Sequence, residues 1–351
     1  MKNIVAGSMA FIFTMSMASL SLAESDRVPG DVFDLSEWKI QLPFDKNKDK
    51  KPDEVDVKKI KKYSHPDFFY LDENNGMVFV SPNKALTTKN TSNARSELRQ
   101  MIRGENTSYK TNSAKNNFAV QARKGSNTFG RVGGRLDATL KVDHVSMRAG
   151  DATTKAAHSL VIGQIHAEKF KNTSSGFGYG NEPIKIYYKK FPDHKYGSVF
   201  WNYERNLPKN DKNRTDIAHA VFGFDWSNAA DPGPQGIALG EEFSYTINVH
   251  KNTMYLTFSN ARLGTKTFAK SLVSQLSADG TMDPLDNKYS YGGDVLYFKA
   301  GVYNQCSPQK GGGLWYAGCP GTGDWDVDKA NGDYAQATFS KLTVGDATPP
   351  R

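Results

Sequence analysis

Apolar and polar residues alternate in many short stretches along the chain, and this alternation constrains the fold more than any other feature of the sequence. A period of two places apolar side chains on one face of a strand and polar ones on the other. Turn-forming Asn, Gly, Asp and Pro residues separate the stretches. The strand-like stretches cover residues 76–82, 116–123, 134–145, 158–168, 184–191, 197–204, 242–259, 294–305 and 334–344.

Helical patterns are few, and residues 55–63 and 269–277 are the best short candidates. Many strands without alternating helices favour two packed antiparallel sheets. We therefore predict an all-β fold, a jelly-roll sandwich with a few short helices.

The first residues have the pattern of a signal peptide. Lys2 precedes an apolar run over residues 4–22, and Ser21 and Ala23 are small residues at the −3 and −1 positions of a cleavage site. We predict that residues 1–23 are removed and that the mature protein is periplasmic or secreted. The run is short for a membrane span and no later segment resembles one, so no membrane contact is expected afterwards. The chain has no linker and no internal repeat, so we expect residues 24–351 to form a single domain.

The net charge of +8 points to a polyanionic partner, although solvated lysines explain it equally well. Nucleic acid, a membrane surface and an acidic polysaccharide all fit the charge. Nucleic acid is the weakest of these candidates, because no basic cluster is interleaved with stacking aromatic residues.

Cysteine usage predicts one disulfide and no metal centre. Only Cys306 and Cys319 occur, and an exported protein meets an oxidising compartment, so we expect them to pair across a Gly-rich loop. The seven histidines lack an HExxH pattern and the cysteines lack CxxC spacing. Residues 45–56 approach the spacing of a calcium loop, but Lys50 stands where Gly is needed and Asp56 replaces the bidentate Glu, which favours a solvated loop.

Three predicted strands carry unusually polar faces. Each presents a set of charged, amide, imidazole or phenol groups opposite an apolar face: Arg95, Glu97 and Arg99; Gln164, His166 and Glu168; and Tyr297, Lys299, Gly301, Tyr303 and Gln305. Taken singly, an exposed charge ladder or a structural histidine explains each set. If the strands are neighbours in one sheet, their polar tips share a groove. Lys299 and Tyr303 lie roughly 13 Å apart along an extended strand, so we do not expect direct contact between them.

Three segments, in order, resemble the signature segments of the alginate lyases of polysaccharide lyase family 7: ARSELR (94–99), GQIH (163–166) and YFKAGVYNQ (297–305). EWKIQLP (37–43), HPDFFYLD (65–72) and YAQATFSKLTV (334–344) also resemble that family. The resemblance implies a jelly roll whose concave sheet forms the substrate cleft. It implies alginate as the partner, and we expect a monomer without a cofactor.

Such a lyase removes the proton at C5 of a uronate and expels the glycosidic oxygen at C4. Because a second negative charge builds beside the carboxylate, donors must neutralise it; Arg95, Gln164 and His166 are the candidates. Tyr303 is the candidate for proton transfer, with its pKa expected to be lowered by cationic neighbours. We expect Glu97 to orient Arg95 and Arg99, and we predict substrate contacts for Glu97, Arg99, Lys299 and Gln305.

Stereochemistry divides the work between two groups. In mannuronate the C5 proton and O4 lie on the same side, so Tyr303 alone could serve as base and then acid. In guluronate they lie on opposite sides, and His166 is the natural base with Tyr303 as acid. Ile165, within the QIH segment, implies guluronate-containing blocks by resemblance alone, and we expect endolytic cleavage.

The sequence leaves two alternative functions open. A non-catalytic jelly-roll module that binds acidic polysaccharide would share the fold and the basic face but would not need His166 together with Tyr303. A glycoside hydrolase would need a close carboxylate pair. The nearest candidate, residues 54–59, has Lys59 where the second acid is required.

Overall fold

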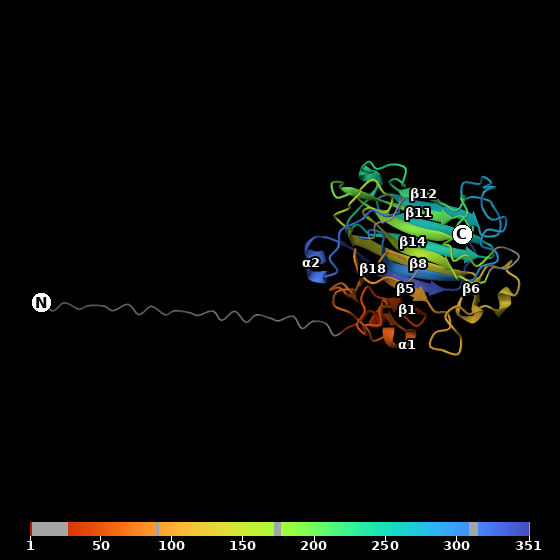
Figure 1. The fold of residues 1–351 in the computed structure, drawn as a ribbon, viewed down its shortest axis with the longest axis horizontal. Helices are drawn as coiled ribbons and strands as arrows, with labels where there is room; N and C mark the ends of the chain where they lie inside the picture. The colour runs from red at the N-terminus through yellow and green to blue at the C-terminus, as the bar shows by residue number, and fades with distance from the viewer. Residues whose placement is uncertain (2–26, 89–90, 172–176, 309–314, 351) are drawn as a thin grey trace.

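The computed structural model describes residues 27–88, 91–171, 177–308 and 315–350, together with Met1. Two sheets pack face to face, with strands running across the molecule and most loops gathered at the strand ends (Figure 1). The predicted signal peptide at residues 1–23 lies outside the described residues apart from Met1.

Among the described residues the larger sheet has eleven strands, and it carries the residues of interest. Its main path, in spatial order, is β12 (Asp216–Phe222), β11 (Tyr196–Glu204), β10 (Ile184–Lys189), β9 (Ser159–Ala167), β17 (Leu296–Asn304), β5 (Arg95–Gln100), β1 (Trp38–Gln41) and β2 (Glu54–Val55). Three short strands lie off this path: β13 (Ile237–Ala238) pairs with β11, β6 (Phe118–Ala119) pairs with β17, and β7 (Arg131–Val132) pairs with β6. All pairs along the main path are antiparallel, and β6 with β7 is the one parallel pair among the described residues.

The second sheet has seven antiparallel strands in the part of the chain that the structure describes. Their spatial order is β16 (Gly264–Ser271), β15 (Thr253–Asn260), β14 (Phe243–His250), β8 (Gly134–His144), β18 (Tyr334–Gly345), β4 (Met77–Pro82) and β3 (Phe69–Leu71). In β8 buried and partly exposed residues alternate along most of the strand, as expected for a sheet with one face on the core and one toward solvent. The all-β sandwich is therefore confirmed.

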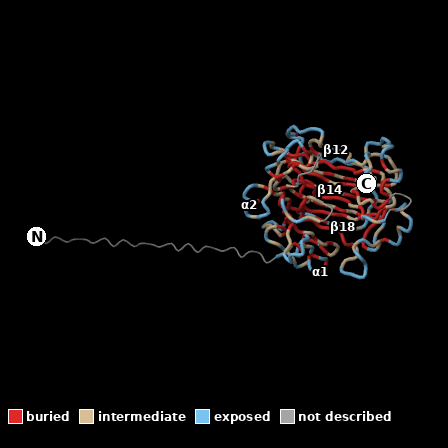
Figure 2. Tube along the Cα trace, in the orientation of Figure 1, coloured by how far each residue is buried: buried red, intermediate tan, exposed pale blue. Residues whose placement is uncertain are grey.

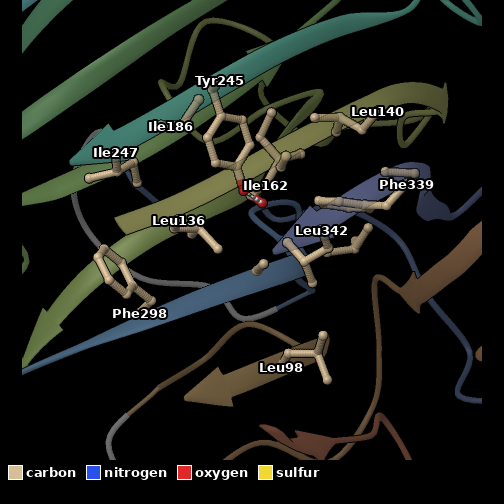
Figure 3. Close-up of a cluster of buried hydrophobic side chains, with 14 of the residues drawn as sticks. Leu98, Leu136, Leu140, Ile162, Ile186, Tyr245, Ile247, Phe298, Phe339 and Leu342 are labelled. Atoms are coloured by element: carbon tan, nitrogen blue, oxygen red, sulfur yellow. Dashed lines mark hydrogen bonds between the residues drawn. The ribbon is translucent and has the colours of Figure 1, made fainter. Parts of the chain in front are cut away.

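The core lies between the sheets, where Leu98, Ile162, Ile186 and Phe298 of the larger sheet meet side chains of the second (Figure 3). The facing residues include Leu136, Leu140, Tyr245, Ile247, Phe339 and Leu342. The burial is continuous through the central strands of both layers (Figure 2). Each fully buried side chain of this kind stabilises the fold by roughly 1.5–3 kcal/mol before entropy is counted.

Helices are short. The segment 55–63 contains α1 (Val57–Ile60), and α2 (Trp325–Ala330) was not predicted. The predicted helix over 269–277 is wrong: residues up to Ser271 finish β16, and the chain then turns. Buried Lys270 donates hydrogen bonds from Nζ to the carbonyl oxygens of Ser271, Ser274 and Leu276, which stabilises this turn in place of a helix. Among the described residues, no helix has the length and apolar character needed to cross a membrane.

The predicted disulfide between Cys306 and Cys319 is confirmed, with 5.4 Å between the Cα atoms. Both cysteines are buried in a small cluster with Ala156, Ala157 and Ala317. The bridge therefore joins two points of the segment that follows β17, and the loop that precedes β9 packs against it through Ala156 and Ala157.

Candidate active site

The three polar faces lie on adjacent strands at the centre of the larger sheet. β17 pairs with β5 on one side and with β9 on the other. Arg95 lies opposite Tyr303, and Lys299 lies opposite both Arg99 and Gln164. His166 lies opposite Tyr297 at the next step along β9. The side chains of these three strands that point away from the core form a surface that we call the polar face. Its members are Arg95, Glu97, Arg99, Gln164, His166, Tyr297, Lys299 and Tyr303.

Glu97 is the centre of the polar face. Its carboxylate forms ion pairs with Nη1 of Arg95, at 2.9 Å, and with Nζ of Lys299. It also accepts a hydrogen bond from the side-chain amide of Gln164. Burial alone would raise the pKa of Glu97, but the positive charges of Lys299 and Arg95 outweigh it and lower the pKa. One buried anion thus holds three donors from three strands at fixed positions.

Arg95 retains a donor that the protein does not use. Its guanidinium lies 3.8 Å from the centroid of the Tyr303 ring and contacts Glu97 through Nη1. Its buried Nε–H has no hydrogen-bond partner within the described part of the chain. An unpaired buried donor costs about 1–3 kcal/mol, so an anionic ligand at this point would relieve a real penalty.

The backbone at Gly301 brings Lys299 and Tyr303 together. Two residues of β17, Gly301 and Val302, oppose the single residue Ile162 of β9, which is a β-bulge. Gly301 has φ +134°, and a Cβ there would lie only 2.7 Å from the carbonyl oxygen of Ser96. Nζ of Lys299 lies 5.9 Å from the centroid of the Tyr303 ring, so the expectation that these side chains do not meet is wrong.

Tyr303 remains protonated in the free protein. Burial raises its pKa and outweighs the opposing charge of Arg95, while Glu182 and Glu97 raise it further. The expected lowering of this pKa by cationic neighbours is therefore wrong in sign, because the same strands that bring the cations also remove the phenol from water and bring carboxylates.

His166 is neutral at rest for the same reason. Burial lowers its pKa, Glu182 opposes this effect, and Lys299 and Arg95 add to the lowering. Its Nδ1 lies 2.7 Å from the carbonyl oxygen of Ala167, and the ring stacks on Tyr297 at a centroid distance of 5.3 Å. The hydrogen bond to Ala167 assigns the proton to Nδ1 and leaves Nε2 able to accept one.

Arg99 and Gln305 lie at the margins of the polar face. Arg99 pairs with Glu168, donates to Asn117 at 2.8 Å, and lies over the Tyr297 ring at 4.0 Å. Glu97 pairs with Arg95, whereas the carboxylate that pairs with Arg99 is that of Glu168, so the expectation that Glu97 orients Arg99 is wrong for the described residues. Gln305 follows the end of β17, and its amide donates to the carbonyl oxygen of Tyr303 at 3.3 Å.

Sequence reasoning missed the continuation of the polar face onto β10 and β11. Lys185 lies opposite both Gln164 and Asn202, and Tyr187 lies opposite Val161 and Phe200. The signal was present, since Ile184, Ile186 and Tyr188 alternate with Lys185, Tyr187 and Lys189. Glu182, which precedes β10, has no such signal because it lies outside the alternating stretch.

Within the described ranges, no group of three or more His, Cys, Asp or Glu side chains is arranged to hold a metal ion. In the loop at residues 45–56, the carboxylates of Asp45 and Asp49 accept hydrogen bonds from backbone N–H groups of the loop itself.

A two-sheet jelly roll whose central strands present guanidinium, amide, imidazole and phenol groups around one buried carboxylate defines a protein of the polysaccharide lyase class. The family model described as alginate lyase matches residues 33–346. An alginate lyase from Klebsiella pneumoniae is 36% identical over 321 residues, which cover 90% of each chain. The chain therefore belongs to the alginate lyases of family PL7.

Solved structures agree with this assignment. The exolytic PL7 alginate lyase from Zobellia galactanivorans is 34% identical with a TM-score of 0.74, over 92% of this chain and 99% of that one. The crystal structure of the Klebsiella pneumoniae alginate lyase is 31% identical with a TM-score of 0.71, over the same shares of the two chains.

Proposed function

We propose that the protein cleaves alginate by β-elimination with a preference for guluronate-containing blocks, using His166 as the base and Tyr303 as the acid. Arg95 and Gln164 bind the carboxylate of the reacting sugar. The observation that carries the proposal is the buried Nε–H of Arg95, which lies next to Tyr303, has no hydrogen-bond partner among the described residues and so provides a site for that carboxylate.

The proposed reaction balances without a cofactor. The C5–H bond breaks and its proton goes to Nε2 of His166, while the electron pair forms the C4–C5 double bond. The C4–O bond breaks, and the leaving oxygen takes the phenolic proton of Tyr303. The proton on His166 then returns to the Tyr303 phenolate through solvent. Preorganised donors on the carboxylate contribute on the order of 10²–10³ in rate each, and positioned proton transfer contributes roughly 10²–10⁴.

The protonation states at rest support the guluronate preference. Opposite-side elimination needs a neutral base and a protonated acid on different groups, which matches His166 with its lowered pKa and Tyr303 with its raised pKa. Same-side elimination on mannuronate needs a Tyr303 phenolate, which burial disfavours. Lys299, Arg99 and Gln305 remain proposed contacts to neighbouring sugars, and Glu97 acts by holding Arg95, Gln164 and Lys299.

The test follows the ultraviolet absorbance of the new conjugated double bond on polyguluronate, polymannuronate and mixed alginate. We expect the highest rate on polyguluronate, and we expect His166→Ala to lower that rate by about 10² or more while polymannuronate loses less. New reducing ends without ultraviolet absorbance would indicate a hydrolase, and binding of the polymer without either product would indicate a lectin. Equal effects of His166→Ala on both polymers would contradict the assignment of His166 as the base for guluronate alone.

We also propose endolytic cleavage and export through removal of residues 1–23. The similarity to an exolytic PL7 enzyme makes product size the deciding measurement. Early release of mixed oligosaccharides supports internal cleavage, whereas monomer as the first product contradicts it. The N-terminal sequence of protein recovered outside the cytoplasm tests the cleavage site.

A further inference from the structure

Glu182 lies beside the candidate base, in the segment between β9 and β10. Its Oε1 is 3.3 Å from Nε2 of His166, the nitrogen left without a proton by the hydrogen bond from Nδ1 to Ala167. The His166 ring is thus flanked by a carbonyl oxygen, a carboxylate and the stacked ring of Tyr297. Two acceptors suit an imidazolium better than a neutral imidazole.

Glu182 is itself held in place and ionised. Its Oε2 lies 3.5 Å from Nζ of Lys185, and its backbone N–H donates to Glu204 at 2.9 Å. Burial acts against its charge, but Lys185, His166 and a hydrogen bond from Glu204 outweigh burial and lower the pKa of Glu182. Burial and the Glu182 charge raise the pKa of Glu204, whose Oε1 lies 2.6 Å from Nη2 of Arg214.

We propose that Glu182 is a positioning residue for His166: it stabilises the imidazolium that forms when Nε2 takes the C5 proton and holds the orientation of that charged ring. This inference rests on the proposed role of His166 as base. Once Nε2 is protonated, the 3.3 Å contact becomes an ion pair inside a largely buried site, where it is stronger than in water.

The charged groups around His166 give the expected sign of the pH effect. Lys299 of β17 and Arg95 of β5 lower the pKa of His166, and Glu182 raises it. Glu168 follows β9 and is engaged with Arg99, and Tyr297 contributes a protonated phenol. Removing the Glu182 charge therefore lowers the pKa of His166, and the acid limb of kcat/KM moves to lower pH.

The experiment compares Glu182→Gln with the wild type on polyguluronate and polymannuronate. We expect kcat on polyguluronate to fall tenfold or more, the acid limb to move to lower pH, KM to stay within about threefold, and polymannuronate to be affected less. An unchanged acid limb together with an unchanged ratio of the two activities overturns the proposal. A wild type inactive on polyguluronate refutes the proposed function instead, so the two failures are distinguishable.

Asp216→Asn is the matched control. Asp216 lies 3.3 Å from the same Lys185 and, among the described residues, has no hydrogen bond or ion pair with His166, so both activities and the acid limb should stay as in the wild type. If Glu182→Gln fails to fold, Glu182→Asp takes its place. The shortened carboxylate should retain the wild-type acid limb with a reduced kcat on polyguluronate, and an unchanged kcat would overturn the proposal.

Discussion

Two strands carry the same short pattern of arginine, any residue and an acid, and the structure uses it in opposite ways. In β8, on the outer face of the second sheet, Arg135 grips Asp137 with two nitrogens at 2.7 Å each. In β5, Arg95 contacts Glu97 through Nη1 alone, and its Nε–H remains without a partner in the described structure.

The neighbouring strands account for the difference. The Glu97 side chain is 2% exposed and also contacts Lys299 and Gln164, whereas the Asp137 side chain is 20% exposed and accepts a hydrogen bond from the Thr246 hydroxyl in addition to those from Arg135. In the outer pair, Arg135 and Asp137 hydrogen-bond to each other and lie on the solvent side of the sheet. The inner pair shares its acid among several donors, and one N–H of its buried guanidinium has no hydrogen-bond partner among the described residues.

The sharpest way to break this comparison is to remove one phenol oxygen from each sheet. Tyr303→Phe should lower kcat on polyguluronate by about 10³ or more, because it deletes the proposed acid, while the melting temperature stays close to that of the wild type. Tyr255→Phe on β15, a partly exposed residue of the outer sheet, should leave both unchanged. A Tyr303→Phe enzyme that retains a tenth of the activity would mean that proton transfer occurs elsewhere.

The second test removes the two acids. Glu97→Gln leaves Lys299 and Arg95 buried without their anion and should destabilise the fold by roughly 3–5 kcal/mol, with a large loss of turnover. Asp137→Asn should cost about 1 kcal/mol or less and leave turnover unchanged, because exposed pairs contribute little. Urea unfolding of both variants gives the free energies. Equal losses would show that burial does not separate the two pairs.

The sequence predicted the features that depend on residue type and period. Alternation placed Arg95, Gln164 and Tyr303 on polar strand faces, and the two-sheet sandwich and the Cys306–Cys319 bridge were both predicted correctly. The resemblance to family PL7 was needed to place those three strands on one sheet, because period alone does not specify which strands pair.

The features of the site that depend on strand register and on burial were not predictable from the sequence. The bulge at Gly301 brings Lys299 and Tyr303 together, and Glu168 beyond the end of β9 replaces Glu97 as the partner of Arg99. The sign of the Tyr303 pKa shift was missed because a count of nearby cations ignores the loss of water around the phenol. The 269–277 segment was predicted to be helical because the burial of Lys270 among carbonyl oxygens is not visible in its sequence.

The smallest expected effect is a difference in how the inner pair, Arg95 and Glu97 with Lys299, and the outer pair, Arg135 and Asp137, respond to pH. Burial and the charge of Arg95 lower the pKa of Lys299 to about 8, despite the opposing carboxylate of Glu97. In the outer pair, the hydrogen bond to Asp137 raises the pKa of Arg135. Burial would raise the pKa of Asp137, but the hydrogen bonds from Arg135 and Thr246 outweigh burial and lower it. Neither group therefore changes charge between pH 6 and 10.

Lys299 is therefore cationic below about pH 8 and neutral above it, and kcat/KM on polyguluronate should fall up to tenfold per unit as pH rises past this value. Lys299→Arg should move this alkaline limb upward, since a guanidinium keeps its charge throughout the range. Tyr303 does not produce the limb, because its raised pKa places its deprotonation at higher pH. A limb that stays near pH 8 in Lys299→Arg would assign the titration to another group and would remove the buried lysine from the chemistry of the polar face.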